Sequence, residues 1–407
     1  MTSPSSAESA PAAPKVEASS AGPFQTLVER FRRGELGQLP VVLTLILIFI
    51  FFEVTSGGIF FSPQNLSNLI LQIATIGFLG LGSVLVLLIA EIDLSLAAVA
   101  SLCGAVLVVL SANQAASAFS AIIIAIVVGV VIGLVNGFFI AVLRVPSFIV
   151  TLAALIGYTG VLIHLLPNAS IRLIDPFLTG IATNYLRFPW DVLLPIPLIA
   201  IYVLLQLWTR VRRQRAGLPQ SPLWEVVVRT GAVVVVSVVA LIVFENYRGI
   251  PYSALILLTA LIVFWLIMRF TSFGRHVYAV GGNAEAARRA GIGVVGIRVT
   301  IFVLASTLAA IGGILASSRA ISASAQINPT LLLDAIAAAV IGGVSLFGGR
   351  GSVWAVVLGS LIIGSLENGL DLLNQGTDVK LMVEGVVLLI AVTADAIVRR
   401  RNAASGR

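Results

Sequence analysis

The 407-residue chain is 58% hydrophobic and only 11% charged, and its mean hydropathy is +1.07. A soluble globular domain of this size has too little interior for so much apolar surface, so the composition predicts an all-α, polytopic membrane protein. The net charge of +7 comes from arginines in short loops, a pattern typical of membrane orientation, and gives no support for nucleic-acid binding. The single cysteine, Cys103, cannot form an intramolecular disulfide and is expected to be a small buried hydrophobe.

Residues 1–39 are expected to form a disordered cytoplasmic tail, because their first part is rich in Ser, Ala and Pro and lacks the apolar core of a signal peptide. The transmembrane region follows over residues 40–398, and residues 399–407 form a second cytoplasmic tail. We expect about 10–12 spans, because the segments from Leu96 and Asp334 are short for a crossing of about 20 residues and are candidates for discontinuous or re-entrant helices. The twelve apolar segments are 40–54, 66–90, 96–110, 118–142, 147–166, 191–208, 224–244, 251–268, 299–317, 334–343, 351–370 and 381–398.

The basic residues predict the orientation of these spans. With the N-terminus inside and the spans alternating, all but five of the 25 Lys and Arg residues fall on the cytoplasmic side. An excess of Lys and Arg marks cytoplasmic loops, so both termini and the polar stretch 270–298 are expected to be cytoplasmic. The five outside are Arg172, Arg187, Arg248, Arg319 and Lys380.

The stretch 270–298, FTSFGRHVYAVGGNAEAARRAGIGVVGIR, is a polar island in an apolar sequence. Asn283 can cap a short helix whose first turn holds Glu285 and whose last turn holds Arg288 and Arg289, and Gly291 can end it. A helix of two turns is marginal alone, so neighbouring spans or a docking partner must hold it. Two interpretations follow: an ordinary connector between spans, or a coupling helix that transmits work from a soluble motor.

Glu91 and Asp93 lie in EIDLS (91–95), between two apolar runs. A carboxylate at the centre of a bilayer costs about 2.5–3.5 kcal/mol, so acids there are usually functional or paired. The alternative is that Asp93 or Ser95 only caps the next helix at the membrane edge.

Two further segments are rich in glycine. Gly133 and Gly137 have the spacing that lets two helices approach closely, and Asn136 between them can hydrogen-bond across the contact, so we interpret this segment first as packing. The run 342–352, GGVSLFGGRGS, contains Ser345 and predicts either a tight turn or a broken helix of the kind that transporters use near a pathway.

Enzymatic motifs are missing from the sequence. No GxxxxGK[ST] pattern occurs, and the only lysines are Lys15 and Lys380, so the chain is not expected to hydrolyse ATP. His164 and His276 are far apart and have no metal-ligand spacing, so no metal site is expected.

The combined motifs resemble those of the permease subunits of bacterial ABC importers for monosaccharides, most closely the xylose type. The resemblance covers about residues 40–400, and region 174–250 is similar to an insert that shorter ribose-type relatives lack. Ala90, Ala97 and Val344 stand where many members have Gly, Gly and Thr, so the sugar stays open. The stretches that carry the resemblance are EIDLS (91–95), GLVNGFFIAVLRVPSFIVTL (133–152), FGRHVYAVGGNAEAARRAGI (273–292), LDAIAAAVIGGVSLFGGRGS (333–352) and ENGLDLL (367–373).

The resemblance implies a multi-pass protein of the bacterial inner membrane that pairs as a homodimer above a cytoplasmic ATP-binding subunit. It further implies that this partner uses the ATP, that an extracytoplasmic sugar-binding protein delivers the sugar, and that this chain binds no cofactor. Stretch 270–298 corresponds to the coupling loop of that family. The implied contacts with the ATPase are Gly281, Gly282, Asn283, Glu285, Ala286, Ala287, Arg288 and Gly291. Candidates for the translocation pathway are Glu91, Asp93, Asn136 and Ser345.

Two other functions stay open. A secondary, ion-coupled sugar transporter would also have twelve spans, but in two six-span halves joined by a long central loop. Here the largest polar island follows the eighth span, which disfavours that architecture. A structural or signalling subunit of the membrane would transport nothing, and uptake of sugar distinguishes it.

Overall fold

The computed structural model describes residues 39–167, 170–217, 223–328 and 330–404. The chain divides into two units, Met1–Pro40 and Val41–Arg407, and the description below concerns the second. The expected N-terminal tail lies outside the described residues up to residue 38.

Helices dominate the described chain, which confirms the all-α expectation. Four short strands form two antiparallel pairs, in which Ser170 lies opposite Ser324 and Tyr185 opposite Pro251. The first part of the chain contains α2 (Leu39–Thr55), α3 (Pro63–Leu88), α4 (Leu96–Ala112), α5 (Ala118–Gly137), the π-helix η1 (Phe138–Val142), α6 (Ser147–Leu165), β1 (Ser170–Arg172), α7 (Pro176–Thr183), β2 (Tyr185–Leu186), α8 (Trp190–Leu193), α9 (Pro195–Arg215) and α10 (Leu223–Glu245). It continues with β3 (Ile250–Pro251), α11 (Tyr252–Phe270), α12 (Ser272–Gly282), α13 (Ala284–Arg289), α14 (Val294–Ala320), β4 (Ser322–Ser324), α15 (Leu331–Ile341), α16 (Ala355–Leu372) and α17 (Thr377–Ala404).

Each of the twelve expected apolar segments coincides with a helix. Within the described residues, seven helices are long and apolar enough to cross a membrane: α3, α5 with η1, α6, α8 with α9, α11, α14 and α16. The helices that begin at Leu96 and Leu331 are shorter, which agrees with the two short segments expected from the sequence. Helix α17 continues through residues 399–404, the first part of the expected C-terminal tail. The number of full crossings stays a prediction.

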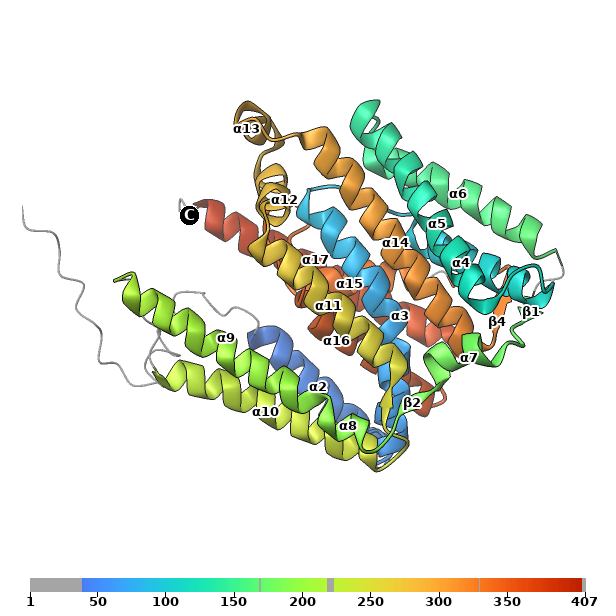
Figure 1. Cartoon of the computed structure of the whole chain (residues 1–407), viewed down its shortest axis with the longest axis horizontal. Coiled ribbons are helices and arrows are strands. Elements are labelled where there is room, and N and C mark those ends of the chain that lie inside the picture. The colour runs from blue at the N-terminus through green and yellow to red at the C-terminus, as the bar shows by residue number, and fades with distance from the viewer. Residues whose placement is uncertain (1–38, 168–169, 218–222, 329, 405–407) are drawn as a thin grey trace, which may run out of the picture. The chain divides into compact units, whose positions relative to one another are not determined.

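Helices α3 and α14 form the centre of the second unit (Figure 1). Helix α14 packs against α3, α4 and α5, and α3 packs in addition against α15 and α16. Glycine permits the closest of these approaches, because a Cβ on Gly313 would lie 1.9 Å from the Ala100 carbonyl oxygen and one on Gly133 would lie 2.5 Å from the Val303 Cα. The predicted close packing at Gly133 is therefore confirmed, and α14 is the partner helix.

Region 174–250 contributes α7 to the interior and the pair α9–α10 to the periphery. Ser318 of α14 holds α7, since its hydroxyl donates to the Leu178 carbonyl at 2.6 Å and accepts from the Ala182 N–H at 2.9 Å. No described side chain of α9 is buried, and α10 packs against both α9 and α3. An exposed apolar face of this kind suits a helix that faces lipid.

Candidate functional site

The short helix α13 is built as the sequence predicts. Asn283 is its N-cap, and the Oδ1 atom accepts a hydrogen bond of 2.9 Å from a backbone N–H of the first turn. Glu285 forms ion pairs with Arg288 and, at 3.2 Å, with Arg289. Gly291 ends the helix in the left-handed conformation, with a φ of +84°. The predicted helix, its cap and its end are confirmed.

The two sides of α13 differ in exposure. Ala287 is 5% exposed and packs into the chain, so it anchors the helix and adds little free surface. Asn283, Glu285, Ala286 and Arg288 are exposed. This exposed side of α13 is the part of the segment that a partner could touch.

Helix α12 brings the polar segment against two distant parts of the chain (Figure 1). A Cβ on Gly281 would lie only 1.7 Å from the carbonyl oxygen of Leu88, the last residue of α3. The Gly349 N–H donates to the same oxygen at 3.0 Å, and the Tyr278 hydroxyl donates to the Gly351 carbonyl at 3.0 Å. We call the meeting point of Gly281, Leu88 and Gly349 the glycine junction. It links the polar segment directly to the end of a central helix.

Tyr278 and Gly282 lie next to the glycine junction in α12. Burial raises the pKa of Tyr278, so its phenol stays protonated and able to donate to the loop. Gly282 is exposed, and a Cβ there would meet nothing within 4 Å. Close packing therefore requires a glycine at position 281 but not at position 282.

The glycine-rich run 342–352 is a turn that joins α15 to α16, as one of the two interpretations predicts. The Ser345 N–H donates to the Arg350 carbonyl at 3.0 Å, and the Ser345 hydroxyl accepts from the Phe347 N–H at 3.2 Å. These bonds close the turn next to the glycine junction. Ser345 is half-buried there, and these hydrogen bonds stay within the turn.

Asp93 and Asn136 meet in a buried hydrogen-bonded network. The Asp93 Oδ1 atom accepts from the Ser95 hydroxyl at 2.6 Å and from the Ser95 N–H at 2.8 Å. The Asn136 amide donates to the Ser95 hydroxyl at 3.2 Å and accepts from the Tyr158 hydroxyl at 3.0 Å. Asp93, Ser95 and Asn136 are each at most 3% exposed. We call Asp93, Ser95, Asn136 and Tyr158 the polar network.

The polar network corrects one expectation about EIDLS. Ser95 occupies the N-cap position of α4, but its side chain makes no capping hydrogen bond and bonds to Asp93 and Asn136 instead. The Asp93 Oδ2 atom is buried and has no hydrogen-bond partner among the described residues. Asn136 is expected from the sequence to bond across the contact that Gly133 makes, which is with α14, but it bonds instead to Ser95 and to Tyr158 of α6, to which nothing in the sequence points. A buried acceptor without a partner is costly unless a ligand, water or proton meets it.

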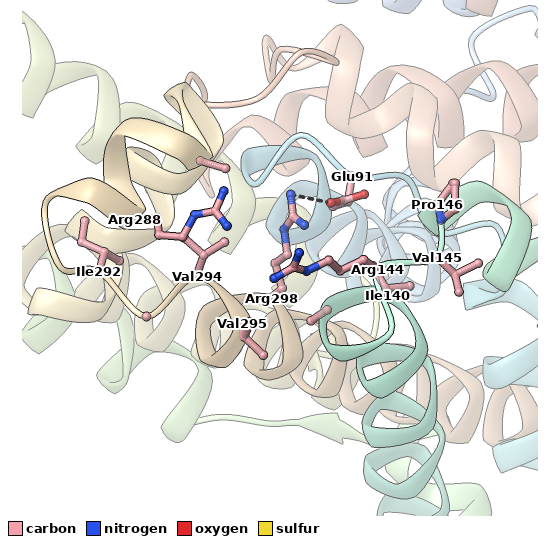
Figure 2. A pocket seen from close by; sticks show the side chains of 13 residues that line it. Glu91, Ile140, Arg144, Val145, Pro146, Arg288, Ile292, Val294, Val295 and Arg298 are labelled. Carbon is pink, nitrogen blue, oxygen red and sulfur yellow. Dashed lines mark ion pairs between the residues drawn. The ribbon is translucent and has the colours of Figure 1, made fainter.

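Glu91 forms an ion pair with Arg298 of α14, at 3.0 Å between Oε1 and Nη2 (Figure 2). The two side chains lie in a pocket of about 510 Å³. Arg144 and Arg288 reach the same pocket from the loop before α6 and from α13. The ion pair therefore joins the loop that carries Asp93 to the last residue of the polar segment 270–298.

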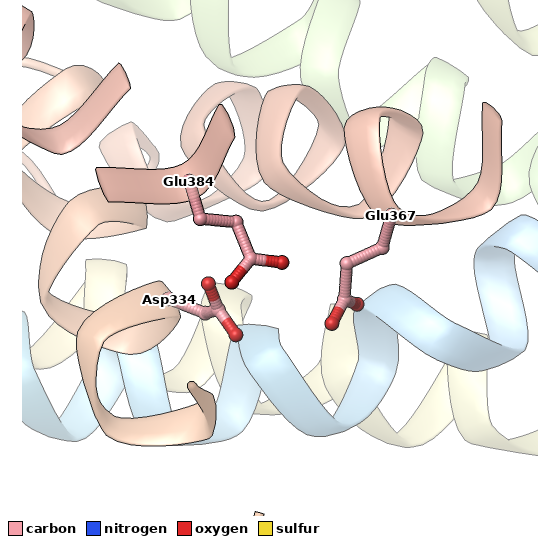
Figure 3. Close-up of side chains that lie close together, drawn as sticks. All are labelled: Asp334, Glu367 and Glu384. Atoms are coloured by element: carbon pink, nitrogen blue, oxygen red, sulfur yellow. The ribbon is translucent and has the colours of Figure 1, made fainter. Parts of the chain in front are cut away.

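Three acidic residues gather at a second place, which no spacing in the sequence predicts. Carboxylate oxygens of Asp334, Glu367 and Glu384 lie within 4.8 Å of one another, from α15, α16 and α17 (Figure 3). Asp334 is 2% exposed, and its Oδ2 atom has no hydrogen-bond partner among the described residues. Such a group has the oxygen donors that a hard cation takes, and otherwise its like charges repel one another. We call these three residues the acidic cluster.

Comparisons with known proteins cover most of the chain. Residues 65–392 match the family model described as branched-chain amino acid transport system / permease component. The chain is 37% identical to the xylose transport system permease protein XylH of Haemophilus influenzae, over 87% of this chain and 95% of that protein. It is 34% identical to XylH of Escherichia coli (89% and 92%) and 34% identical to the ribose import permease protein RbsC of Bacillus subtilis (89% and 94%). No solved structure matches the chain.

Proposed function

The chain belongs to the permease-component family of transport systems, among its ABC monosaccharide permeases, and from this premise we propose that it forms the membrane path of an ATP-driven D-xylose importer. The observation that carries the proposal is its similarity, over nearly their full length, to permeases named for xylose. The insert-like region 174–250 favours xylose over ribose, although a ribose import permease is similar over the same share of the chain.

The proposed importer divides its work among several chains. A cytoplasmic ATP-binding subunit hydrolyses ATP, an extracytoplasmic sugar-binding protein delivers xylose, and two copies of this chain enclose the path. The chain itself binds no cofactor and catalyses no reaction. It sits in the bacterial inner membrane with both termini in the cytoplasm, an orientation supported by the distribution of Lys and Arg.

Helix α13 is the proposed contact with the ATPase. Its exposed residues Glu285, Ala286 and Arg288 meet the partner, together with Asn283 and Gly291, while Ala287 holds the helix to the rest of the chain. Gly281 and Gly282 lie at the end of α12, where the glycine junction joins the segment to α3. ATP can drive the permease only if its two conformations differ in affinity for the ATPase, and a displacement of α13 reaches α3 through this junction.

The polar network is the proposed polar part of the sugar path. The free Oδ2 atom of Asp93 can accept a hydrogen bond from a sugar hydroxyl when the helices around it open. Asn136 positions Ser95 and so holds the other carboxylate oxygen in place. Glu91 and Ser345 lie nearer to the ATPase contact and are proposed to line the cytoplasmic exit.

Uptake into liposomes that hold this chain, its ATPase and its binding protein tests the proposal. Labelled xylose, ribose and arabinose are compared with and without ATP on the ATPase side. We expect xylose to enter only with ATP, and the double change Glu285→Ala with Arg288→Ala to abolish entry. Arg275→Ala, at an exposed residue of α12, is the matched control and should leave uptake unchanged.

The other outcomes are equally informative. ATP-dependent entry of ribose or arabinose in place of xylose would keep the mechanism and discard the sugar. Entry that ignores ATP and follows a proton or sodium gradient would overturn the ABC mechanism and support a secondary transporter. No entry of any sugar from a fully assembled complex would favour a structural or signalling subunit.

A further inference from the structure

The pocket around Glu91 and Arg298 is the strongest unexplained feature of the described chain (Figure 2). Residues of η1 and of the loop 144–146 form one wall, and α13 with the start of α14 forms the other. Its volume of about 510 Å³ is large enough for a small polar group with part of an attached chain. The proposed function uses two residues of this pocket, Arg288 at the ATPase contact and Glu91 at the exit, and gives no role to Arg144 and Arg298.

The charges that line the pocket do not balance. Arg144, Arg288 and Arg298 line it, against the single carboxylate of Glu91. Arg298 is paired with Glu91, and Arg288 is paired with Glu285 on the outer side of α13. Arg144 has no hydrogen-bond or ion-pair partner in the described part of the chain. Figure 2 shows the side chains of Arg144 and Arg298 in the same pocket. Two guanidinium groups that line one pocket favour an anion there.

Two backbone features and one buried side-chain atom add to the preference of the pocket for an anion. Helix α14 begins at the pocket, since Gly293, Val294 and Val295 line it, so the positive end of the helix dipole lies beside this space. The Nε atom of Arg298 is buried and has no partner among the described residues. Arg144 has a φ of +59°, a left-handed conformation that an ordinary residue adopts only at a cost. The backbone is therefore strained at Arg144, whose side chain lines the pocket.

The apolar part of the lining distinguishes between sources of the anion. Val145, Val295 and Ile292 line the pocket beside the arginines, and Val295 is 45% exposed. Leu143, just before Arg144, is 52% exposed. A free inorganic anion gains nothing from such a rim, whereas the glycerol and first acyl carbons of a lipid do. On the proposed orientation, η1 ends and α14 begins at the cytoplasmic face, which is the level of inner-leaflet headgroups.

We propose that this pocket binds the phosphate of an anionic phospholipid of the cytoplasmic leaflet, with Arg144 and Arg298 as its principal ligands. A phosphatidylglycerol headgroup has a net negative charge and fits the unbalanced arginines. Zwitterionic lipids carry the same phosphate but also an ammonium group, which Arg144 and Arg298 repel. Because α13 forms one wall, the bound lipid also supports the position of that helix next to the membrane.

Native mass spectrometry of the purified, delipidated full chain tests the assignment. Phosphatidylglycerol, phosphatidylcholine and inorganic phosphate are added separately at equal concentration. We expect a phosphatidylglycerol adduct that Arg144→Gln weakens about fivefold, the loss typical of one surface arginine, and that Arg144→Lys largely retains. Arg172→Gln, at an exposed arginine of β1, is the matched control and should bind as the wild type does. Equal unfolding temperatures show that each variant is folded.

Several results would overturn the assignment. Equal binding of phosphatidylglycerol by the wild type and Arg144→Gln would exclude the pocket as the lipid site. Equal binding of phosphatidylcholine and phosphatidylglycerol would remove the role of net charge. Arg144-dependent binding of inorganic phosphate without phosphatidylglycerol would assign the pocket to a soluble anion. No binding of any probe would leave an acidic side chain of a partner protein as the occupant, against the proposal.

Discussion

Replacing Gly281 with alanine should disturb the contact through which α13 acts on the membrane helices. The added methyl group would lie 1.7 Å from the Leu88 carbonyl oxygen and 2.7 Å from the Gly349 nitrogen. Carbon and oxygen atoms approach to roughly 3.3 Å, so the glycine junction must open by roughly 1.5 Å to accept the methyl group. This movement breaks the Gly349–Leu88 hydrogen bond, and overpacking of this kind costs about 1–3 kcal/mol.

Gly282→Ala is the matched control, because a Cβ at that neighbouring position meets nothing within 4 Å. Both variants are assembled with the ATPase and the binding protein, and thermal unfolding, ATP hydrolysis and xylose uptake are measured together. We expect Gly281→Ala alone to lower the unfolding temperature and to reduce the xylose moved per ATP hydrolysed. Identical behaviour of the two variants in both respects would refute the role of the junction.

Three further changes probe other parts of the chain, each read from the thermal unfolding of the purified protein. Asn136→Leu removes the amide that donates to the buried Ser95 hydroxyl and accepts from the half-buried Tyr158 hydroxyl, and should destabilise the chain by about 1–3 kcal/mol. Glu384→Gln replaces one of the three crowded carboxyl groups of the acidic cluster with a neutral amide and should raise the unfolding temperature at neutral pH. Ala90→Gly should also raise it, because Ala90 has a φ of +61° and the left-handed conformation costs an L-residue about 1–2 kcal/mol.

One control substitution and two contradicting outcomes complete these three tests. Ala153→Gly makes the same substitution as Ala90→Gly at an exposed position inside α6, where it should lower stability. An unchanged unfolding temperature for Asn136→Leu would contradict the polar network. A lower temperature for Glu384→Gln would mean that a bound cation or a shared proton already stabilises the acidic cluster.

The parts of the fold that depend on local chemistry could be predicted from the sequence. The apolar runs place every expected membrane helix, because burial of the backbone in lipid requires helix wherever such a run is long. Asn283, the charges of α13 and Gly291 predict that helix, since caps and the helix dipole act within one or two turns. Gly133 predicts a close helix contact for the same reason, though not which helix would make it.

The parts that depend on tertiary packing could not be predicted. Ala286 and Ala287 cannot be told apart in the sequence, and only the packing of α13 against the chain buries Ala287. Tyr158 joins the polar network from a different helix, 22 residues after Asn136, at a spacing that no motif describes. Arg298 pairs with Glu91 across 207 positions, and the acidic cluster draws on three helices.

Cross-linking from Ala286 tests most directly whether α13 is where the ATPase engages this chain. A cysteine at this exposed position can be labelled selectively with a thiol-directed photo-cross-linker, because the native Cys103 is 0% exposed. In the assembled complex, Ala286→Cys should give an adduct with the ATP-binding subunit. Ile174→Cys, at a residue that is 75% exposed on the side expected to face outward, should give none. An import-competent complex that yields no adduct from Ala286→Cys would contradict the account.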